Sequence, residues 1–152
     1  DVRPELATVI ALEERTASAY DAALERFRKG RLSAESLALL VDKTIVPELQ
    51  AASARLKTFD KVPPEHQPLV ASAEDYLRLR HESWRLRAEG LRTMEKIVSR
   101  APNRERSGTT ALQQSVTTTL RQAERTERVS LESLEKIKPA GHEQPRSADD
   151  QP

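Results

Sequence analysis

The sequence predicts an all-α protein, an antiparallel up-down-up-down four-helix bundle, from three observations. Leu and Ala dominate the apolar residues, aromatic residues make up 3% of the chain and charged residues 32%, which is typical of long amphipathic helices. Apolar residues recur at every seventh position in the middle of the chain, and such residues share one side of a helix because two turns take about 7.2 residues. Short connections containing proline or glycine separate four apolar stretches of similar length, so successive helices should run antiparallel.

The first predicted helix begins at Pro4, since proline is tolerated in a first helical turn, and it ends at Gly30. Its apolar residues follow helical spacing: Leu6, Val9, Ile10, Ala17, Tyr20, Leu24 and Phe27.

The second predicted helix begins after Ser33, a favourable N-cap, with Leu32 and Leu37 placed to pack across the cap. It continues to Phe59, but Pro47 lies in its interior and lacks the N–H of a regular turn. We therefore expect a kink over residues 43–47. The prolines within 60–64 then reverse the chain.

The third predicted helix, from about Leu69 to about Arg100, is the longest and carries two apolar stripes, which implies two helical neighbours. The first stripe is the heptad ladder of Val70, Leu77, Trp84, Leu91 and Val98. The second contains Tyr76, Leu79, Ser83, Leu86 and Gly90.

The fourth predicted helix follows a polar turn over residues 102–108, is capped by Thr109 or Thr110, and stops at Pro139. The chain of 152 residues is expected to form one domain over residues 1–138. Residues 139–152 lack apolar side chains that could anchor them, so we expect a disordered tail.

The residues present exclude several kinds of chemistry. The three histidines, His66, His81 and His142, lack an acidic residue three positions earlier, as a dimetal bundle requires. The chain contains no cysteine, and its four glycines form no hydrolase, phosphate-loop or dinucleotide motif. We therefore predict a non-enzymatic protein with no catalytic residue, no metal and no cofactor.

The charges nearly cancel, with 25 basic and 24 acidic residues, which argues against a nucleic-acid partner. Residues 78–106, however, contain nine basic and four acidic side chains, a net charge of +5. Arg78, Arg85 and Arg92 are the candidate face for a protein partner, because guanidinium groups bind carboxylates bidentately. The alternative is a solvated face neutralised within the helix by Glu74, Glu82 and Glu89.

Arg80 and Arg87 lie at the edge of the predicted core, where charges need partners. Folding the last two helices about a turn near residue 105 sets Arg87 level with Glu124 and places Glu127 between the two arginines. We predict an interhelical network of Arg80, Arg87, Glu124 and Glu127, joined by Glu13 of the first helix.

Trp84 lies at the centre of the ladder, so we expect its ring in the core near Tyr20 and its N–H directed to a polar side chain. The alternative is a pocket formed by Tyr76, Trp84, Arg80 and Arg87 that prefers small anions. His81 is expected to be a partly exposed polar residue.

Four stretches within residues 35–138 carry a resemblance: TIVPELQAASARL, VPPEHQPLV, YLRLRHESWRLRAEGLR and LRQAERTERVSLESLEKIK. They resemble soluble helical segments of uncharacterised bacterial proteins, some of them attached to rhomboid-type intramembrane proteases. The resemblance implies an accessory domain in an extracytoplasmic or membrane-adjacent place, and it carries over no catalytic residue. No apolar run here approaches the roughly 18 residues of a membrane span.

The leading functional prediction is a non-enzymatic helical interaction or sensory module that forms an accessory part of a larger bacterial protein. Its third helix should meet a protein partner. The first alternative is a small-molecule-binding bundle with the pocket beside Trp84. The second is a homodimer formed through surplus apolar surface on the third helix.

Overall fold

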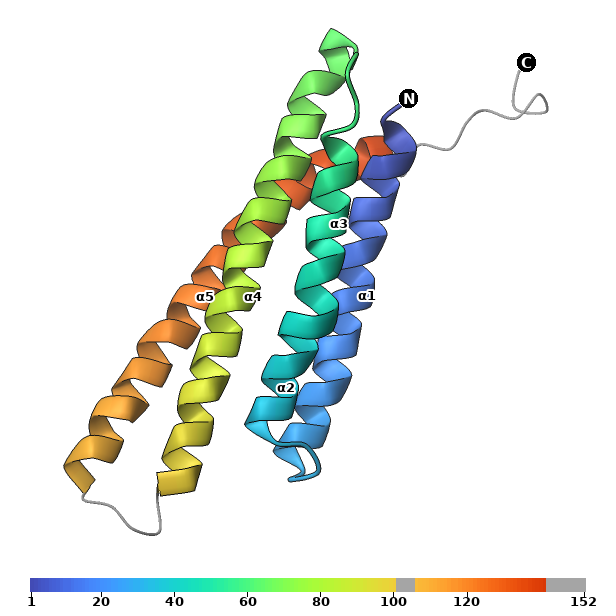
Figure 1. Cartoon of the computed structure of the whole chain (residues 1–152). Helices are drawn as coiled ribbons and strands as arrows, with labels where there is room; N and C mark the ends of the chain where they lie inside the picture. The colour runs from blue at the N-terminus through green and yellow to red at the C-terminus, as the bar shows by residue number, and fades with distance from the viewer. Residues whose placement is uncertain (101–105, 142–152) are drawn as a thin grey trace.

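The computed structural model describes residues 1–100 and 106–141, and it confirms an all-α bundle without strands in these ranges (Figure 1). Its elements are α1 (Arg3–Arg28), α2 (Ala34–Leu40), the π-helical turn η1 (Val41–Ile45), α3 (Val46–Leu56), the 3-10 turn η2 (Pro64–His66), α4 (Gln67–Arg100) and α5 (Arg106–Gly141). Because α2, η1 and α3 follow one another directly, they form a single rod, and the molecule consists of four antiparallel rods. No helix of the described ranges is long and apolar enough to cross a bilayer.

The connection between α1 and α2 follows the expectations from its sequence. Gly30 has a φ of +73°, a conformation that glycine adopts without steric cost, and its N–H donates to the carbonyl of Phe27 at 3.0 Å. The Ser33 hydroxyl accepts a hydrogen bond from the Ser36 N–H at 3.0 Å, which confirms the predicted N-cap. The chain therefore turns tightly between the two helices.

The irregularity in the second rod lies next to Pro47, as predicted, and takes the form of the π-helical turn. The N–H of Val46 donates to the carbonyl of Val41, five residues earlier. A regular turn would bring the proline ring against the carbonyl of Lys43, and the wider turn gives the ring room. The rod consequently continues through the proline to Leu56.

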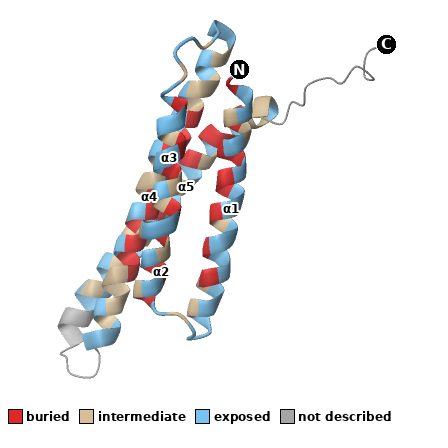
Figure 2. Cartoon of the chain, turned by 45° about the vertical axis from the view of Figure 1, so that its right-hand side comes forward, coloured by how far each residue is buried: buried red, intermediate tan, exposed pale blue. Residues whose placement is uncertain are grey.

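The core lies among α1, the second rod, α4 and the second half of α5 (Figure 2). The heptad ladder is buried at Leu77, Trp84 and Leu91. The prediction that it faces the core is wrong at Val98, whose exposed fraction is 67%. The second stripe is buried apart from a half-buried Leu79. Two stripes do meet two neighbours, because α4 packs against both the second rod and α5.

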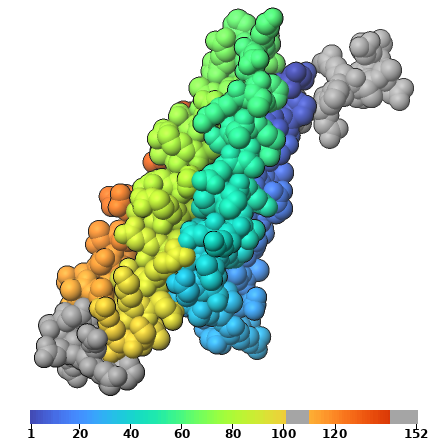
Figure 3. All heavy atoms as spheres, viewed as in Figure 1, coloured from blue at the N-terminus to red at the C-terminus, as the bar shows by residue number. Residues whose placement is uncertain are grey.

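Toward the end where α1 and α2 connect, α4 stays on α2 as far as Arg92, which lies 3.6 Å from Glu35, while the first half of α5 diverges from α1 (Figures 1 and 3). Over residues 110–122 no side chain of α5 is buried, whereas Ala123, Leu134 and Ile137 are. The first half of α5 therefore packs on α4 alone. The divergence also leaves Val98 uncovered, because the neighbouring rods no longer reach the last turns of α4.

Both predicted ends of the last helix are wrong. The helix begins at Arg106, so Thr109 and Thr110 lie inside it, and it continues through Pro139 to Gly141. A Cβ at Gly141 would lie 2.5 Å from Ile10 Cδ1 and 3.2 Å from the backbone nitrogen of Ala7, so this end is seated tightly on α1. The predicted turn lies partly, and the tail over 142–152 wholly, outside the described residues.

Amide hydrogen exchange should reveal the unequal support along the α4–α5 hairpin. We expect faster exchange over residues 92–100 and 110–122 than over residues 76–91 and 123–137, because local opening costs least where few apolar contacts are buried. Exchange followed by mass spectrometry on peptic fragments measures the difference. Uniform protection along both helices would contradict the expectation.

Candidate functional site

Arg80 of α4 lies at the centre of a buried ion-pair cluster that joins three helices. Its exposed fraction is 3%. Its Nε and Nη2 donate to Oε1 and Oε2 of Glu13 on α1 at 2.6 and 3.1 Å, and its Nη1 donates to Oε1 of Glu127 on α5 at 2.5 Å. The guanidinium group thus makes a bidentate pair with one carboxylate and a single bond to another. We call Arg80, Glu13 and Glu127, with Tyr76 and Ser83, the Arg80 cluster.

The remaining polar groups of the Arg80 cluster are satisfied locally. The Tyr76 hydroxyl donates to Glu13 Oε1 at 2.9 Å. Nη1 of Arg80 also donates to the Ser83 hydroxyl at 3.1 Å, and that hydroxyl donates to the Arg80 carbonyl at 2.7 Å. The Arg80 guanidinium carbon lies 4.2 Å from the centre of the Trp84 ring, a cation–π contact.

The charge of Arg80 is held in place by its neighbours. Burial alone would lower the pKa of Arg80, but the hydrogen bonds and the negative charge of Glu13, followed by the charge of Glu127, raise that pKa above its ordinary value. Arg80 therefore stays charged, and its Nε and both Nη atoms already donate within the cluster.

The structure brings together four of the five residues predicted for the interhelical network. Arg80 meets Glu13 and Glu127, and Arg87 Nη2 lies 3.8 Å from Glu127 Oε1. Glu124 does not join them, because it is exposed and forms no ion pair with the described residues. Ala123 of α5 faces the interior, and Glu127, four positions on, shares its face, whereas Glu124 is turned by about 100°.

Glu127→Ala is expected to lower the free energy of unfolding by about 1–2 kcal/mol, because Arg80 loses one charged hydrogen bond but keeps the pair with Glu13. The side chain of Glu127 is 31% exposed, so water can replace part of the lost contact. Chemical denaturation measures the change. An unaltered free energy of unfolding would show that the contact between Arg80 and Glu127 does not stabilise the fold.

A small cavity of about 250 Å³ opens beside Trp84. Arg80, Arg87 and Trp84 of the predicted pocket line it, but Tyr76 is fully buried and does not. The other lining residues are Glu13, Ala17, Tyr20, Asp21, Leu24, Glu127 and Leu131. Three carboxylates against two guanidinium groups give a lining whose charge does not favour an anion.

The aromatic side chains at this cavity pack against each other and against Arg87. The rings of Tyr20 and Trp84 meet edge to face at 5.0 Å, and the Arg87 guanidinium lies 5.5 Å from the Tyr20 ring centre. The prediction that the Trp84 N–H meets a polar side chain is wrong, since Nε1 is buried without a partner in the described structure. Trp84 is therefore held by packing and by the cation–π contact with Arg80, without a hydrogen bond.

The arginines of the predicted partner face do not form one free cationic surface. Arg78 pairs with Asp75 at 3.3 Å and not with Glu74, while Arg85 donates two hydrogen bonds to Glu82 at 3.0 and 2.7 Å. The Arg85 bond lowers the pKa of Glu82.

Arg92 ties α4 to the second rod. Its Nη1 lies 2.6 Å from Oδ2 of Asp42, and its Nε lies 3.6 Å from Oε2 of Glu35. All three predicted face arginines thus have carboxylate partners within this chain, and Arg92 bridges to another rod.

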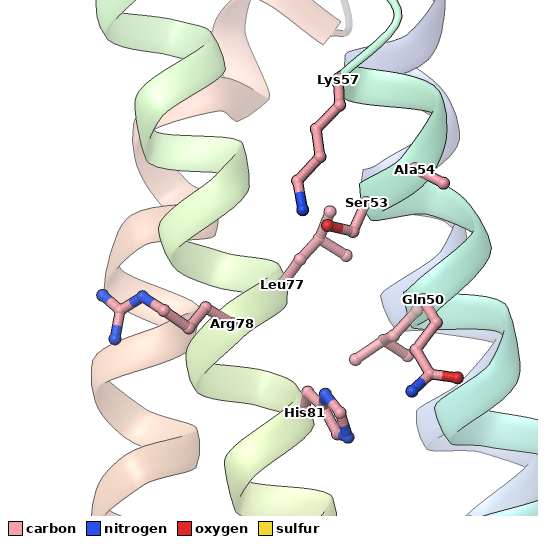
Figure 4. A pocket seen from close by; sticks show the side chains of 8 residues that line it. Gln50, Ser53, Ala54, Lys57, Leu77, Arg78 and His81 are labelled. Atoms are coloured by element: carbon pink, nitrogen blue, oxygen red, sulfur yellow. The ribbon is translucent and has the colours of Figure 1, made fainter.

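A larger groove of about 520 Å³ lies between α3 and α4 (Figure 4). We call it the α3–α4 groove; it is lined by Leu49, Gln50, Ser53, Ala54, Lys57, Leu77, Arg78 and His81. His81 is half-buried here, as expected for a partly exposed polar residue. The sequence did not indicate this site, because the lining residues are single positions on two helices and follow no motif.

No group of three or more metal-ligating side chains occurs in the described ranges. In comparisons with protein-family models, curated proteins and solved structures, nothing matches this chain.

Alkaline pH should destabilise the fold through Tyr76. Burial, reinforced by the charge of Glu13, raises the pKa of the Tyr76 hydroxyl above its ordinary value of 10.0. Above that pH the unfolded chain loses this proton and the native state keeps it, so stability falls by about 1.4 kcal/mol per pH unit. Below the ordinary value the contribution is fully present.

Tyr76→Phe tests this dependence. We expect the variant to lose about 1.5–3 kcal/mol at neutral pH, because a hydrogen bond to a charged group disappears, and to show a shallower decline above about pH 10. Urea denaturation across that range measures both effects. Equal slopes for the variant and the parent would contradict the assignment.

Proposed function

We propose that the protein is a non-enzymatic helical interaction module, an accessory part of a larger bacterial protein, and that the free end of the α4–α5 hairpin binds its partner. An apolar groove of about 300 Å³ at this end carries the proposal. We call it the tip groove; it is lined by Met94, Ile97, Val98, Gln113, Val116 and Thr117. Its apolar residues are only half-buried or, at Val98, exposed, because no third rod covers this part of the hairpin.

The charge around the tip groove selects the kind of partner. Residues 94–100 and 110–123 contain three basic side chains, Lys96, Arg100 and Arg121, and one acidic side chain, Glu95. Lys96 is turned about 200° around α4 from Met94, so Arg100 and Arg121 are the cations nearer to the groove. None of the three cations forms an ion pair within the described ranges, in contrast to Arg78, Arg85 and Arg92. The complementary partner is an amphipathic helix with apolar side chains for the groove and acidic side chains for its rim.

Two designed helical peptides of equal length test the proposal, one built from Leu and Glu and the other from Leu and Lys. Fluorescence anisotropy should show that the Leu/Glu peptide binds the protein and that Val98→Glu weakens binding about tenfold, equivalent to about 1.4 kcal/mol. Val129→Glu is the matched control, because Val129 is the exposed valine of α5 with a 47% exposed fraction. Equal binding of both peptides, or no binding, would overturn the proposal.

A second copy of the chain is the competing occupant of the tip groove. Like charges on the two rims would oppose such a homodimer. Sedimentation equilibrium distinguishes the two cases, since a dimer lost in Val98→Glu and kept in Val129→Glu would replace the acidic partner.

The resemblance to helical segments attached to rhomboid-type proteases supports an accessory role in an extracytoplasmic or membrane-adjacent place. Small-molecule binding is the second candidate function. The α3–α4 groove favours it more than the cavity beside Trp84, whose lining is richer in carboxylates.

A further inference from the structure

We propose that the α3–α4 groove binds a small organic anion that joins an apolar body to one carboxylate or phosphate group. This inference concerns a different face from the tip groove and does not rest on the proposed partner. The groove lies between two antiparallel helices, α3 and α4, that pack together along their lengths (Figures 1 and 4).

Polar donors line the groove from both helices. From α3 and its C-terminal end, the Lys57 amine and the Ser53 hydroxyl point into the space between the helices (Figure 4). From α4, the imidazole of His81 lies across from the amide of Gln50 (Figure 4). None of these four side chains forms a hydrogen bond or ion pair with another described residue, so their donors are available.

The charge of the lining has one sign. No carboxylate lines the groove, although the chain contains 24 acidic residues. Arg78 contributes only its stem, because its guanidinium points away from α3 in Figure 4 and pairs with Asp75 at 3.3 Å. Lys57 is therefore the unpaired cation of the site, and an anion placed beside it gains a charge-assisted hydrogen bond.

The floor of the groove is apolar. Leu49 and Leu77 are 1% and 2% exposed and close the space between the helices. A volume of about 520 Å³ lies within the range of small-molecule sites, which combine an apolar surface with a few placed polar groups. The apolar surface that a ligand can still cover belongs to the exposed lining residues, Ala54 and the aliphatic stems of Lys57 and Arg78. An inorganic anion would leave these apolar groups in water, whereas the body of an organic anion covers them.

Octanoate and octyl phosphate are the probes, with octylammonium and octanol as charge controls. Titration followed by ¹H–¹⁵N NMR should shift amide signals over residues 49–57 and 77–81, and each bound probe should raise the melting temperature with its concentration. Binding of one anion alone identifies the headgroup and supports the proposal. Equal binding of octylammonium, or shifts confined to other residues, would overturn it.

Lys57→Glu is the decisive variant, and Lys43→Glu is its matched control on the same rod. Both lysines are exposed, so neither change removes a core contact, and Lys43 does not line the groove. We expect Lys57→Glu to weaken binding of the anionic probe at least tenfold and Lys43→Glu to change it less than about twofold. Equal effects of the two variants would overturn the site. Val98→Glu should leave probe binding unchanged. The test of the α3–α4 groove is therefore independent of the test of partner binding at the tip groove.

Discussion

Arg80→Leu lowers the free energy of unfolding by about 3–5 kcal/mol, the largest loss expected for one charged residue of this protein. The substitution leaves the carboxylate of Glu13 buried with only the Tyr76 hydroxyl as a hydrogen-bond donor. It also removes the cation from the face of Trp84 and the hydrogen bond that Arg80 donates to Glu127 of α5. Chemical denaturation at neutral pH measures the loss.

Two controls show whether the unpaired charge causes the effect. Arg85→Ala removes an arginine whose side chain is 57% exposed and should change stability by less than about 0.5 kcal/mol. The triple variant with leucine in place of Arg80, Glu13 and Glu127 should recover most of the lost stability. Apolar side chains of similar volume can replace a buried network of ion pairs. If the combined variant is as unstable as Arg80→Leu, lost packing and not an uncompensated carboxylate is responsible.

Trp84→Ala is expected to cost about 3–5 kcal/mol, because it empties the largest buried side chain from the middle of the bundle. The ring is 1% exposed and contacts both Tyr20 and Arg80. Urea denaturation followed by circular dichroism measures the change without relying on the fluorescence that the substitution removes.

Val98→Ala is the matched control, because Val98 belongs to the same heptad ladder two repeats further along α4. Its exposed fraction of 67% limits the expected change to about 0.5 kcal/mol. A similar loss in both variants would mean that a partner covers the end of the hairpin in solution. A small loss for Trp84→Ala would contradict the packing described here.

The network around Arg80 shows how far pairing could be predicted. Two antiparallel helices joined by a short turn have a defined register, and that register predicted the level of Glu127 opposite Arg80 and Arg87. The register does not define the rotation of α5 about its own axis, because that rotation depends on which face of the helix docks. The structure turns Ala123 and Glu127 inward and leaves Glu124 in solvent.

Other predictions failed where a global feature decided the outcome. Val98 obeys the same heptad pattern as Trp84, yet it is exposed because the hairpin has left the bundle at its position. The helix continues past Pro139 because its last turn packs on α1 around Ile10 and Ala7. The α3–α4 groove joins positions that are far apart in the sequence, so no local spacing could indicate it.

The sequence by itself determined that this chain forms four helical rods, where the first connection turns, and which faces of the rods carry apolar residues. These properties follow from helical periodicity, capping and proline chemistry, which act over a few neighbouring residues. Only the tertiary structure decided where the rods diverge, which carboxylates reach Arg80, and which surfaces stay open. Those outcomes depend on how side chains from different helices pack against each other. These helices are far apart in the sequence, so no short stretch of it determines the packing.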